Sequence, residues 1–311
     1  MTIKSNRNGR AFEAIVFHDL VNELKKQKLN CSITERGYTY HKQDMIFFNE
    51  LADGDTKDIK LRNDYVKNVR LITKWLFKEF DIESCDSILL DKLPDDAGKK
   101  GDITDIRIIL TKNNKSKEIN LSLKNNSNAL KHSRIAGIPQ WLGISEDSNE
   151  CKNYIKEYNL IWKDIAKKIE NHNSKSTNKV KIYNQLDLIS KDFKTNEIYN
   201  KYYNLIENFF INFCCTPVRT NQLFRYLIGN VEYYKIINKS KKIHIAQYAN
   251  IISPTQITFG RNSNNYLLLT FNNSWKISIR LHNGDDRLSP SLKVDAQLDK
   301  DFKVPEKIIK K

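Results

Sequence analysis

The chain has few of the residues that break regular structure or cross-link a fold. Its 311 residues include 10 glycines, 6 prolines and 5 cysteines. No two cysteines form a CxxC pair, and no cysteine–histidine group has the spacing of a zinc site. The adjacent Cys214 and Cys215 are poor candidates for a disulfide, so reduced thiols are expected. The sequence therefore argues against a disulfide-stapled secreted domain and against a zinc module.

Long apolar segments are also lacking. No stretch approaches the ~20 apolar residues that a helix needs to cross a bilayer. The first residues contain no apolar core of a signal peptide. The expectation is a soluble cytoplasmic protein.

Acidic residues are the minority among the charged ones. The chain has 52 Lys and Arg against 37 Asp and Glu, a formal net charge of +15. This balance suits a polyanionic partner such as nucleic acid. The chain is also rich in Lys, Asn and Ile, as a coding sequence biased toward A and T would produce. Charge alone therefore supports nucleic-acid binding only modestly.

The apolar pattern predicts an α/β protein. Apolar residues recur every three or four positions in residues 11–28, 58–80, 154–169 and 197–213, which predicts helices. A helical pattern is also expected at residues 129–132, and an exposed loop at residues 173–181. Alternating patterns predict strands at residues 233–237, 242–249, 256–259, 266–271, 275–281 and 291–298, with turns at 272–274 and 283–286. We expect an α/β core with helical insertions over residues 1–230, and a β-rich region over 231–311 that serves recognition or completes the core.

Two neighbouring segments carry the most informative pattern. Residues 101–110 (GDITDIRIIL) and 118–124 (EINLSLK) alternate apolar and polar side chains, and residues 112–117 between them are typical of a turn. A turn centred near Asn114 places Asp105 opposite Ser122 and Lys124. A carboxylate, a hydroxyl and an ammonium then lie on neighbouring strands. A hard oxygen ligand beside a lysine is what a divalent metal and an attacking water need to cut a phosphodiester.

These residues resemble the PD-(D/E)xK nuclease motif, in which a strand-borne Asp pairs with an acidic-x-Lys sequence on the next strand. Ser122 departs from the motif, because Asp or Glu is usual at that place. Longer segments resemble HaeIII-type type II restriction endonucleases: SNRNGRAFE at 5–13, LSLKNNSNALKHSR at 121–134, IRLHN at 279–283 and SLKVD at 291–295. These blocks lie near the start, the middle and the end, so the resemblance is expected to be full length.

The resemblance implies a fold and an activity. The expected fold is a PD-(D/E)xK restriction-endonuclease-like core, a central mixed sheet flanked by helices. The expected activity is Mg²⁺-dependent hydrolysis of phosphodiesters in double-stranded DNA at a short palindrome, with GGCC as the family's expected target. A palindromic site favours a homodimer on DNA, because a symmetric target mirrors a symmetric protein. A cognate DNA methyltransferase is the expected genetic partner.

Five residues are predicted to form the catalytic site. Asp105 is the predicted metal ligand, and Lys124 is predicted to orient and deprotonate the attacking water or to stabilise charge on the phosphate. Asp102 competes with Asp105, and its alternative roles are to cap the turn or to approach the metal through water. Ser122 offers a hard cation less charge than a carboxylate does. The missing charge is expected from another residue. The resemblance implies Glu13 on the first helix as a second metal ligand, because many nucleases of this fold bring a helix glutamate toward the metals; a solvent-facing helix residue is the alternative.

Phosphate and base contacts are expected from two polar clusters. The first directly follows the catalytic strand, and the second is explained equally well by a solvated hairpin. The residues are Asn125, Lys131, His132 and Arg134 in the first cluster, and Arg280, His282, Asn283 and Lys293 in the second. His132 has a general base as its less favoured alternative role.

Two other functional classes remain open. One is a repair or mobile-element nuclease that selects structure rather than sequence, which cleavage at one defined sequence would exclude. The other is a catalytically silent DNA-binding module that has lost its acidic residue at position 122. Mg²⁺-dependent cutting would exclude that class.

Overall fold

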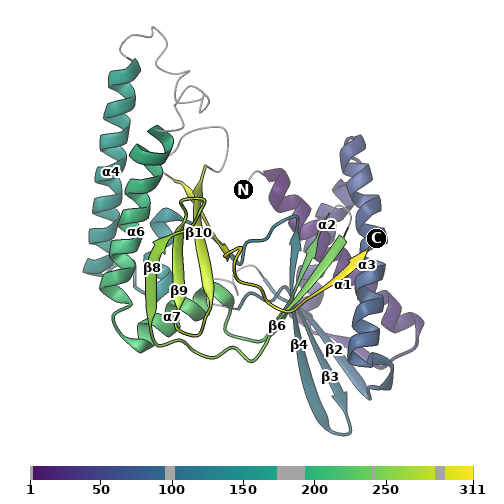
Figure 1. The fold of residues 1–311 in the computed structure, drawn as a ribbon. Helices are drawn as coiled ribbons and strands as arrows, with labels where there is room; N and C mark the ends of the chain where they lie inside the picture. Colours follow the sequence, from purple (N-terminus) through teal and green to yellow (C-terminus); the bar gives the residue numbers. More distant parts are fainter. Residues whose placement is uncertain (1–2, 95–101, 174–192, 240–241, 284–290, 311) are drawn as a thin grey trace. The chain divides into compact units, whose positions relative to one another are not determined.

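The computed structural model describes residues 3–94, 102–173, 193–239, 242–283 and 291–310. The chain forms two compact units, each built from separated segments (Figure 1). The first unit contains Met1–Asn128, Gly229–Ile251 and Val304–Lys311, and the second contains Ala129–Ile228 and Ile252–Lys303. This grouping differs from a sequential division at residue 230. The chain enters the second unit at Ala129, returns to the first unit at Gly229–Ile251, and returns to it again at Val304.

A mixed seven-stranded sheet organises the first unit. Its strand order is β1-β2-β3-β4-β6-β7-β12. β1 is parallel to β2 and β4 is parallel to β6, and the other neighbours are antiparallel. The strands are β1 (Cys31–Ile33), β2 (Ser87–Lys92), β3 (Ile106–Lys112), β4 (Lys115–Asn125), β6 (Tyr233–Asn238), β7 (Lys242–Tyr248) and β12 (Glu306–Lys310).

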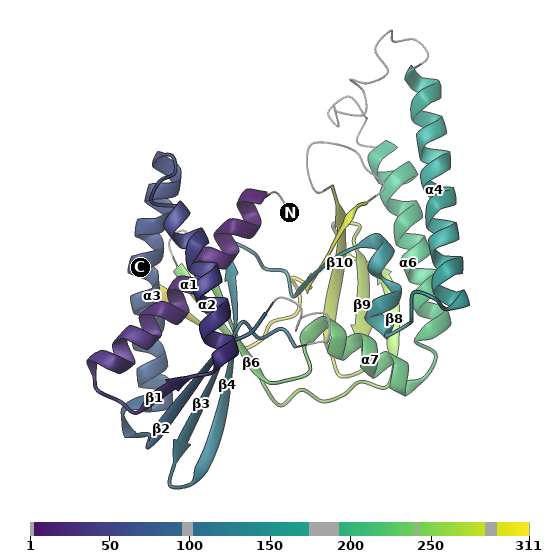
Figure 2. The same cartoon turned by 180° about the vertical axis from the view of Figure 1, so that it is seen from behind.

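Three helices pack against one face of this sheet (Figure 2). They are α1 (Ile3–Lys26), α2 (Glu35–Glu50) and α3 (Thr56–Phe80). The apolar stripe of α1 is fully buried against strand residues such as Ile108 and Leu121. The Asp55 side chain caps α3 by accepting a hydrogen bond from the Asp58 amide, and the helix ends at Asp81 in a left-handed conformation.

The hairpin of β3 and β4 turns tightly. Asn113 and Asn114 form its two-residue loop, with φ angles of 50° and 60°. Two consecutive residues with positive φ are typical of a type I′ turn, in which asparagine is favoured. The turn fixes the register of the hairpin, in which Ile106 lies opposite Leu121.

The second unit contains an antiparallel five-stranded sheet of order β5-β11-β10-β9-β8. Its strands are β5 (Lys131–Arg134), β8 (Ile257–Arg261), β9 (Leu267–Phe271), β10 (Lys276–His282) and β11 (Lys293–Leu298). Its helical segments are η3 (Ile135–Gly137), η4 (Pro139–Leu142), α4 (Asn149–Asn173), η6 (Phe193–Tyr199), α6 (Asn200–Phe213) and α7 (Pro217–Ile228). Aromatic contacts of Phe210 with Phe259, and of Phe224 with Phe271, join α6 and α7 to the sheet.

One predicted element is wrong. Residues 129–132 do not form a helix, because Leu130 donates its amide to the Ala296 carbonyl at 2.7 Å and Lys131 begins β5. Pairing with β11, a strand distant in sequence, overrides the local pattern.

The other predicted helices correspond to α1, α3, α4 and α6, and the six predicted strands to β6 through β11. Helices α2 and α7 and strands β1, β2 and β12 were not predicted. The predicted loop at 173–181 and turn at 283–286 fall almost wholly outside the described residues.

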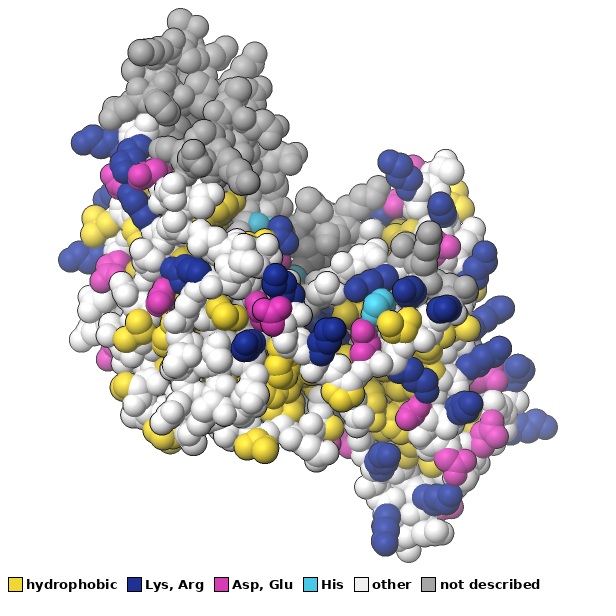
Figure 3. Space-filling model, in the orientation of Figure 1, with side chains coloured by type: hydrophobic (Ala, Val, Ile, Leu, Met, Phe, Trp, Pro, Cys, Tyr) yellow, Lys and Arg dark blue, Asp and Glu magenta, His cyan; other side chains and the backbone are white. Residues whose placement is uncertain are grey.

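The surface of the described residues carries many charges. Lys and Arg side chains are interspersed with Asp and Glu over the face shown in Figure 3, rather than gathered in one continuous patch. None of the helices in the described ranges combines the length and the apolar character that spanning a membrane requires.

Candidate active site and basic sheet face

Asp105 and Lys124 form an ion pair at the end of the β3–β4 hairpin that lies away from its turn. The Asp105 amide donates to the Leu121 carbonyl at 2.8 Å, so this residue lies opposite Ser122, as the turn position predicts. Asp105 Oδ2 accepts hydrogen bonds from the Leu123 amide at 2.5 Å and from Lys124 Nζ at 3.4 Å. Both side chains are partly buried, so their charges interact with less screening than on an open surface.

Ser122 lies beside a buried lysine that the sequence analysis missed. The serine is 1% exposed, and its Oγ has no hydrogen-bond partner among the described residues. Lys235 on β6 is its partner in the parallel register and donates to the Asn128 carbonyl at 2.6 Å. Burial lowers the pKa of Lys235 to about 7, and repulsion from Lys124 and Lys239 adds to the shift. The usual place of the acidic residue therefore faces a buried amine, an arrangement that only strand pairing reveals.

Glu13 belongs to a buried ion-pair cluster. Its carboxylate is 12% exposed and lies 3.4 Å from Nζ of Lys92, which is 2% exposed. Lys92 also forms a short ion pair with Asp44, whose second oxygen forms an ion pair with Arg10 Nη2 at 2.5 Å. Glu13 is therefore not the solvent-facing helix residue of the alternative interpretation.

Lys92 connects Glu13 electrostatically to Asp105. Burial lowers the pKa of Lys92, but the carboxylates of Glu13, Asp44 and Asp105 outweigh burial and hold this pKa above its ordinary value. The Leu93 amide donates to the Asp105 carbonyl at 3.0 Å, which holds the end of β2 beside Asp105. The sequence signal for Lys92 was a charged residue that continues the inward-facing alternation of Ile88 and Leu90.

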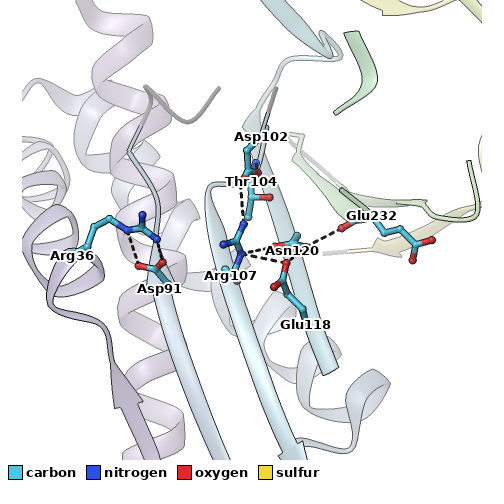
Figure 4. Close-up of polar contacts among 8 residues, drawn as sticks. All are labelled: Arg36, Asp91, Asp102, Thr104, Arg107, Glu118, Asn120 and Glu232. Carbon is cyan, nitrogen blue, oxygen red and sulfur yellow. Dashed lines mark hydrogen bonds and ion pairs between the residues drawn. The ribbon is translucent and has the colours of Figure 1, made fainter. Parts of the chain in front are cut away.

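Asp102 takes the capping role. Its Oδ1 accepts from the Thr104 amide at 3.0 Å, and its Oδ2 forms an ion pair with Arg107 at 2.8 Å (Figure 4). The same guanidinium donates to Asn120 Oδ1 at 3.1 Å and lies 3.3 Å from Glu118. These contacts hold Asp102 in a polar network with β3 and β4, as a residue that caps the turn would be, and its role at the metal stays a prediction.

The donor chemistry of Asp105 and Glu13 fits a magnesium ion. Carboxylate oxygens are the hard ligands that Mg²⁺ prefers, and proteins often bind it through one or two carboxylates together with water and substrate phosphate. Within the described ranges, no group of three or more His, Cys, Asp or Glu side chains is arranged to hold a metal. Asp105 and Glu13 stay predicted ligands on their carboxylate chemistry.

Asn125, the last residue of β4, belongs to a chain of hydrogen-bonded amide side chains. Its Oδ1 accepts from Asn238 Nδ2 at 3.1 Å, and Asn238 Oδ1 accepts from Asn68 Nδ2 at 2.9 Å. Asn125 also interacts with the buried Tyr65 hydroxyl. These contacts tie the end of β4 to β6 and α3.

Five of the eight predicted DNA contacts share one face of the five-stranded sheet. Strand pairing places Asp295 between His132 and Arg280, and Lys293 between Arg134 and His282. We call this surface the basic sheet face: His132, Arg134, Arg280, His282 and Lys293, with Asp295 among them. Two clusters that are distant in sequence are therefore neighbours. The opposite face of the same strands is buried and mostly apolar, with residues such as Leu281, Val294 and Ala296.

The remaining two predicted contacts lie elsewhere. Lys131 points to the buried side, with Nζ 4.5 Å from the centre of the Tyr226 ring. This placement is that of a packing residue. Asn283 is partly buried and its carbonyl accepts from His282 Nδ1 at 2.9 Å.

The comparisons with known proteins agree with the resemblance found in the sequence. Residues 9–255 and 243–300 match the family model described as HaeIII restriction endonuclease. The chain is also similar to the type II restriction enzyme HaeIII of Haemophilus aegyptius, with 28% identity over 337 residues that cover 96% of this chain and 95% of the relative. The matched residues include Glu13, the β3–β4 hairpin and the basic sheet face. The chain therefore belongs to the HaeIII restriction endonuclease family.

Proposed function

We propose that this type II restriction enzyme hydrolyses phosphodiesters in both strands of double-stranded DNA at a short palindrome, using Mg²⁺. GGCC is the expected target. The observation that carries the proposal is the pairing of Asp105 with Lys124 at the open end of the β3–β4 hairpin. The hairpin lies within a mixed sheet that has helices on one face, which supports a PD-(D/E)xK-like core.

The residues of this site have separate roles. Asp105 and Glu13 would hold the metal ion, which when bound supplies positive charge to the scissile phosphate. Lys124 Nζ orients the attacking water, accepts its proton when neutral, or stabilises phosphate charge when protonated. Lys92 fixes the Glu13 carboxylate through their ion pair. Ser122 contributes no charge, so the carboxylates on α1 and before β3 carry the site.

DNA recognition falls to the basic sheet face. Arg134, Arg280 and Lys293 carry donors for phosphates and base edges, since Arg and Lys pair with guanine in the major groove. A palindromic target favours two copies of the chain on one site, related by two-fold symmetry. A cognate methyltransferase that protects the same sequence is the expected genetic partner.

Plasmid cleavage tests the proposal. The purified protein is incubated with plasmid DNA and Mg²⁺, and the fragment ends are sequenced. We expect all ends to derive from one short palindrome. Ends without a common sequence would instead support a nuclease that selects structure. Intact DNA under conditions in which the protein binds it would support a silent binding module.

Two substitutions test the active site. Asp105→Ala and Lys124→Ala are expected to abolish cleavage while binding in Ca²⁺ survives, because neither side chain is part of the apolar core. Lys115→Ala, at the exposed turn end of the same strand, is the matched control and should cut normally. Near-normal turnover by Asp105→Ala would refute the assigned metal site.

A further inference from the structure

A carboxylate lies in the middle of the basic sheet face. Asp295 is flanked in register by His132 and Arg280, and its side chain is 15% exposed. Its Oδ1 lies 2.7 Å from His132 Nδ1 and its Oδ2 lies 2.9 Å from His282 Nε2. Each carboxylate oxygen therefore holds one imidazole ring. An acidic group at a DNA-binding surface repels phosphates, so its place here needs a reason.

The contacts of His282 define its charge. Nε2 faces the Asp295 carboxylate, and Nδ1 faces the Asn283 carbonyl at 2.9 Å. Both partners can only accept hydrogen bonds, so both ring nitrogens must carry protons for the two bonds to form. The hydrogen bond to Asp295 raises the pKa of His282, against the opposing effects of burial and Arg280. His282 is therefore held as an imidazolium ion.

Asp295 is held ionised in return. Burial raises the pKa of Asp295, but hydrogen bonds from His132 and His282 outweigh it and hold this pKa well below its ordinary value. Among the described residues, the charged side chains beside this cluster in the strand register are all positive: Arg134 on β5, Arg280 on β10 and Lys293 on β11. The carboxylate thus reduces the repulsion among the cations around it.

We propose that Asp295 is a positioning residue for DNA binding, which orients the rings of His132 and His282 and keeps the imidazolium charge of His282 toward DNA phosphates. The proposal rests on the proposed function of the basic sheet face. The Nδ1 contact with Asp295 fixes the ring of His132, and its Nε2, on the other side of the ring, donates to a phosphate oxygen when protonated. Asp295 acts through the two histidines and touches no phosphate itself.

The proposal and simple charge repulsion predict opposite changes in DNA affinity when Asp295 is neutralised. Removing a carboxylate from a surface that binds a polyanion should strengthen binding. Asp295→Asn should instead weaken binding to a GGCC duplex in Ca²⁺ by about tenfold, roughly the loss of one charge-assisted hydrogen bond. Asp301→Asn is the matched control. It removes an exposed carboxylate from the same unit and should bind as tightly as the wild type or more tightly.

The same substitution in a protein without the two histidines tests whether Asp295 acts through them. In His132→Gln/His282→Gln protein, Asp295→Asn should no longer weaken binding and should strengthen it, since only the repulsion of phosphate remains. Equal weakening in both backgrounds would overturn the proposal. So would tighter binding by Asp295→Asn alone.

A spectroscopic measurement is independent of DNA. Carbon-13 NMR titration of the histidines should show a lower pKa for His282 in Asp295→Asn than in the wild type. An unchanged titration would overturn the proposal. Arg134→Ala and Arg280→Ala separate this outcome from failure of the proposed function: if neither changes DNA binding, the basic sheet face itself is not the recognition surface.

Discussion

At the scale of the residue, the candidate active site depends on how buried charges are paired. Glu13→Gln should lower the rate of Mg²⁺-dependent cleavage by about a hundredfold or more, because Ser122 leaves Asp105 and Glu13 as the only proposed carboxylate ligands. Single-turnover cleavage of plasmid DNA measures the effect. Glu23→Gln, on the same helix at a more exposed position, should cut normally. A wild-type rate in Glu13→Gln would place Glu13 outside the site.

Lys92 is expected to contribute strongly to stability, because it pairs with two buried carboxylates. Lys92→Met leaves the carboxylates of Glu13 and Asp44 without their shared cation inside the protein. Breaking a buried ion pair in this way typically lowers the free energy of unfolding by about 3–5 kcal/mol. Urea unfolding should show a loss of this size. Lys74→Met, at an exposed position of α3, should change stability little, and equal stabilities of the two variants would contradict the prediction.

Lys235 predicts a dependence of stability on pH. Its pKa of about 7 lies below the ordinary value of 10.5, so between these values the unfolded chain binds the extra proton. The contribution of Lys235 to stability therefore rises with pH in this window, by up to about 1.4 kcal/mol per pH unit. Below about pH 7 Lys235 is protonated in the folded protein as well, and the full cost of burying its charge then lowers the free energy of unfolding. Relative to the wild type, Lys235→Met should be most stabilised at about pH 6 and less so at about pH 9. Parallel pH profiles from urea unfolding would refute this.

At the scale of the element, local pattern explains what the sequence could predict. The β3–β4 hairpin follows from alternating side chains and an Asn-rich turn, all within a short segment, and it placed Asp105 opposite Ser122 correctly. Strand β5 was mistaken for helix because its partner β11 lies far along the chain. Lys92 and Lys235 were not predicted for the same reason. Lys92 contacts Asp44, and Lys235 lies beside Ser122, only in the tertiary fold.

The hairpin turn offers a test at the same scale. Asn114 has a φ of 60°, a conformation that β-branched side chains resist. Asn114→Val should therefore lower the free energy of unfolding by about 1–2 kcal/mol. Asn114→Gly keeps the turn favourable and is the matched control, with stability near that of the wild type. Thermal unfolding of the two variants measures the difference, and identical midpoints would show that the turn does not fix the hairpin.

At the scale of the whole molecule, the residues proposed for catalysis and those proposed for recognition belong to different compact units. Glu13, Asp105 and Lys124 belong to the first unit, and the basic sheet face to the second. The block at residues 121–134 contributes to both, because the chain leaves β4 and enters β5 within a few residues. This continuity explains why one sequence block carries both the predicted catalytic lysine and predicted DNA contacts.

The net charge of +15 sets the general part of DNA affinity. Lys and Arg release counterions from phosphates, so affinity must fall steeply as salt rises. A phosphate-contacting residue affects all sequences alike, and its loss reduces the salt slope by about 1. A base-reading residue affects one position of the target, where a good contact is worth ~1–3 kcal/mol of discrimination.

Arg134 and Arg280 are expected to differ in role, one contacting phosphates and the other reading a base. Both are exposed on the basic sheet face, but Arg134 also donates to the Ser291 carbonyl at 2.6 Å, which restrains its guanidinium. We predict that at least one of Arg134→Ala and Arg280→Ala changes the preferred sequence. Competition binding in Ca²⁺ with single-base variants of GGCC, repeated at several salt concentrations, separates the two effects. If the wild type binds every variant equally, base recognition does not occur at the binding step, and the selectivity of the enzyme must arise during cleavage.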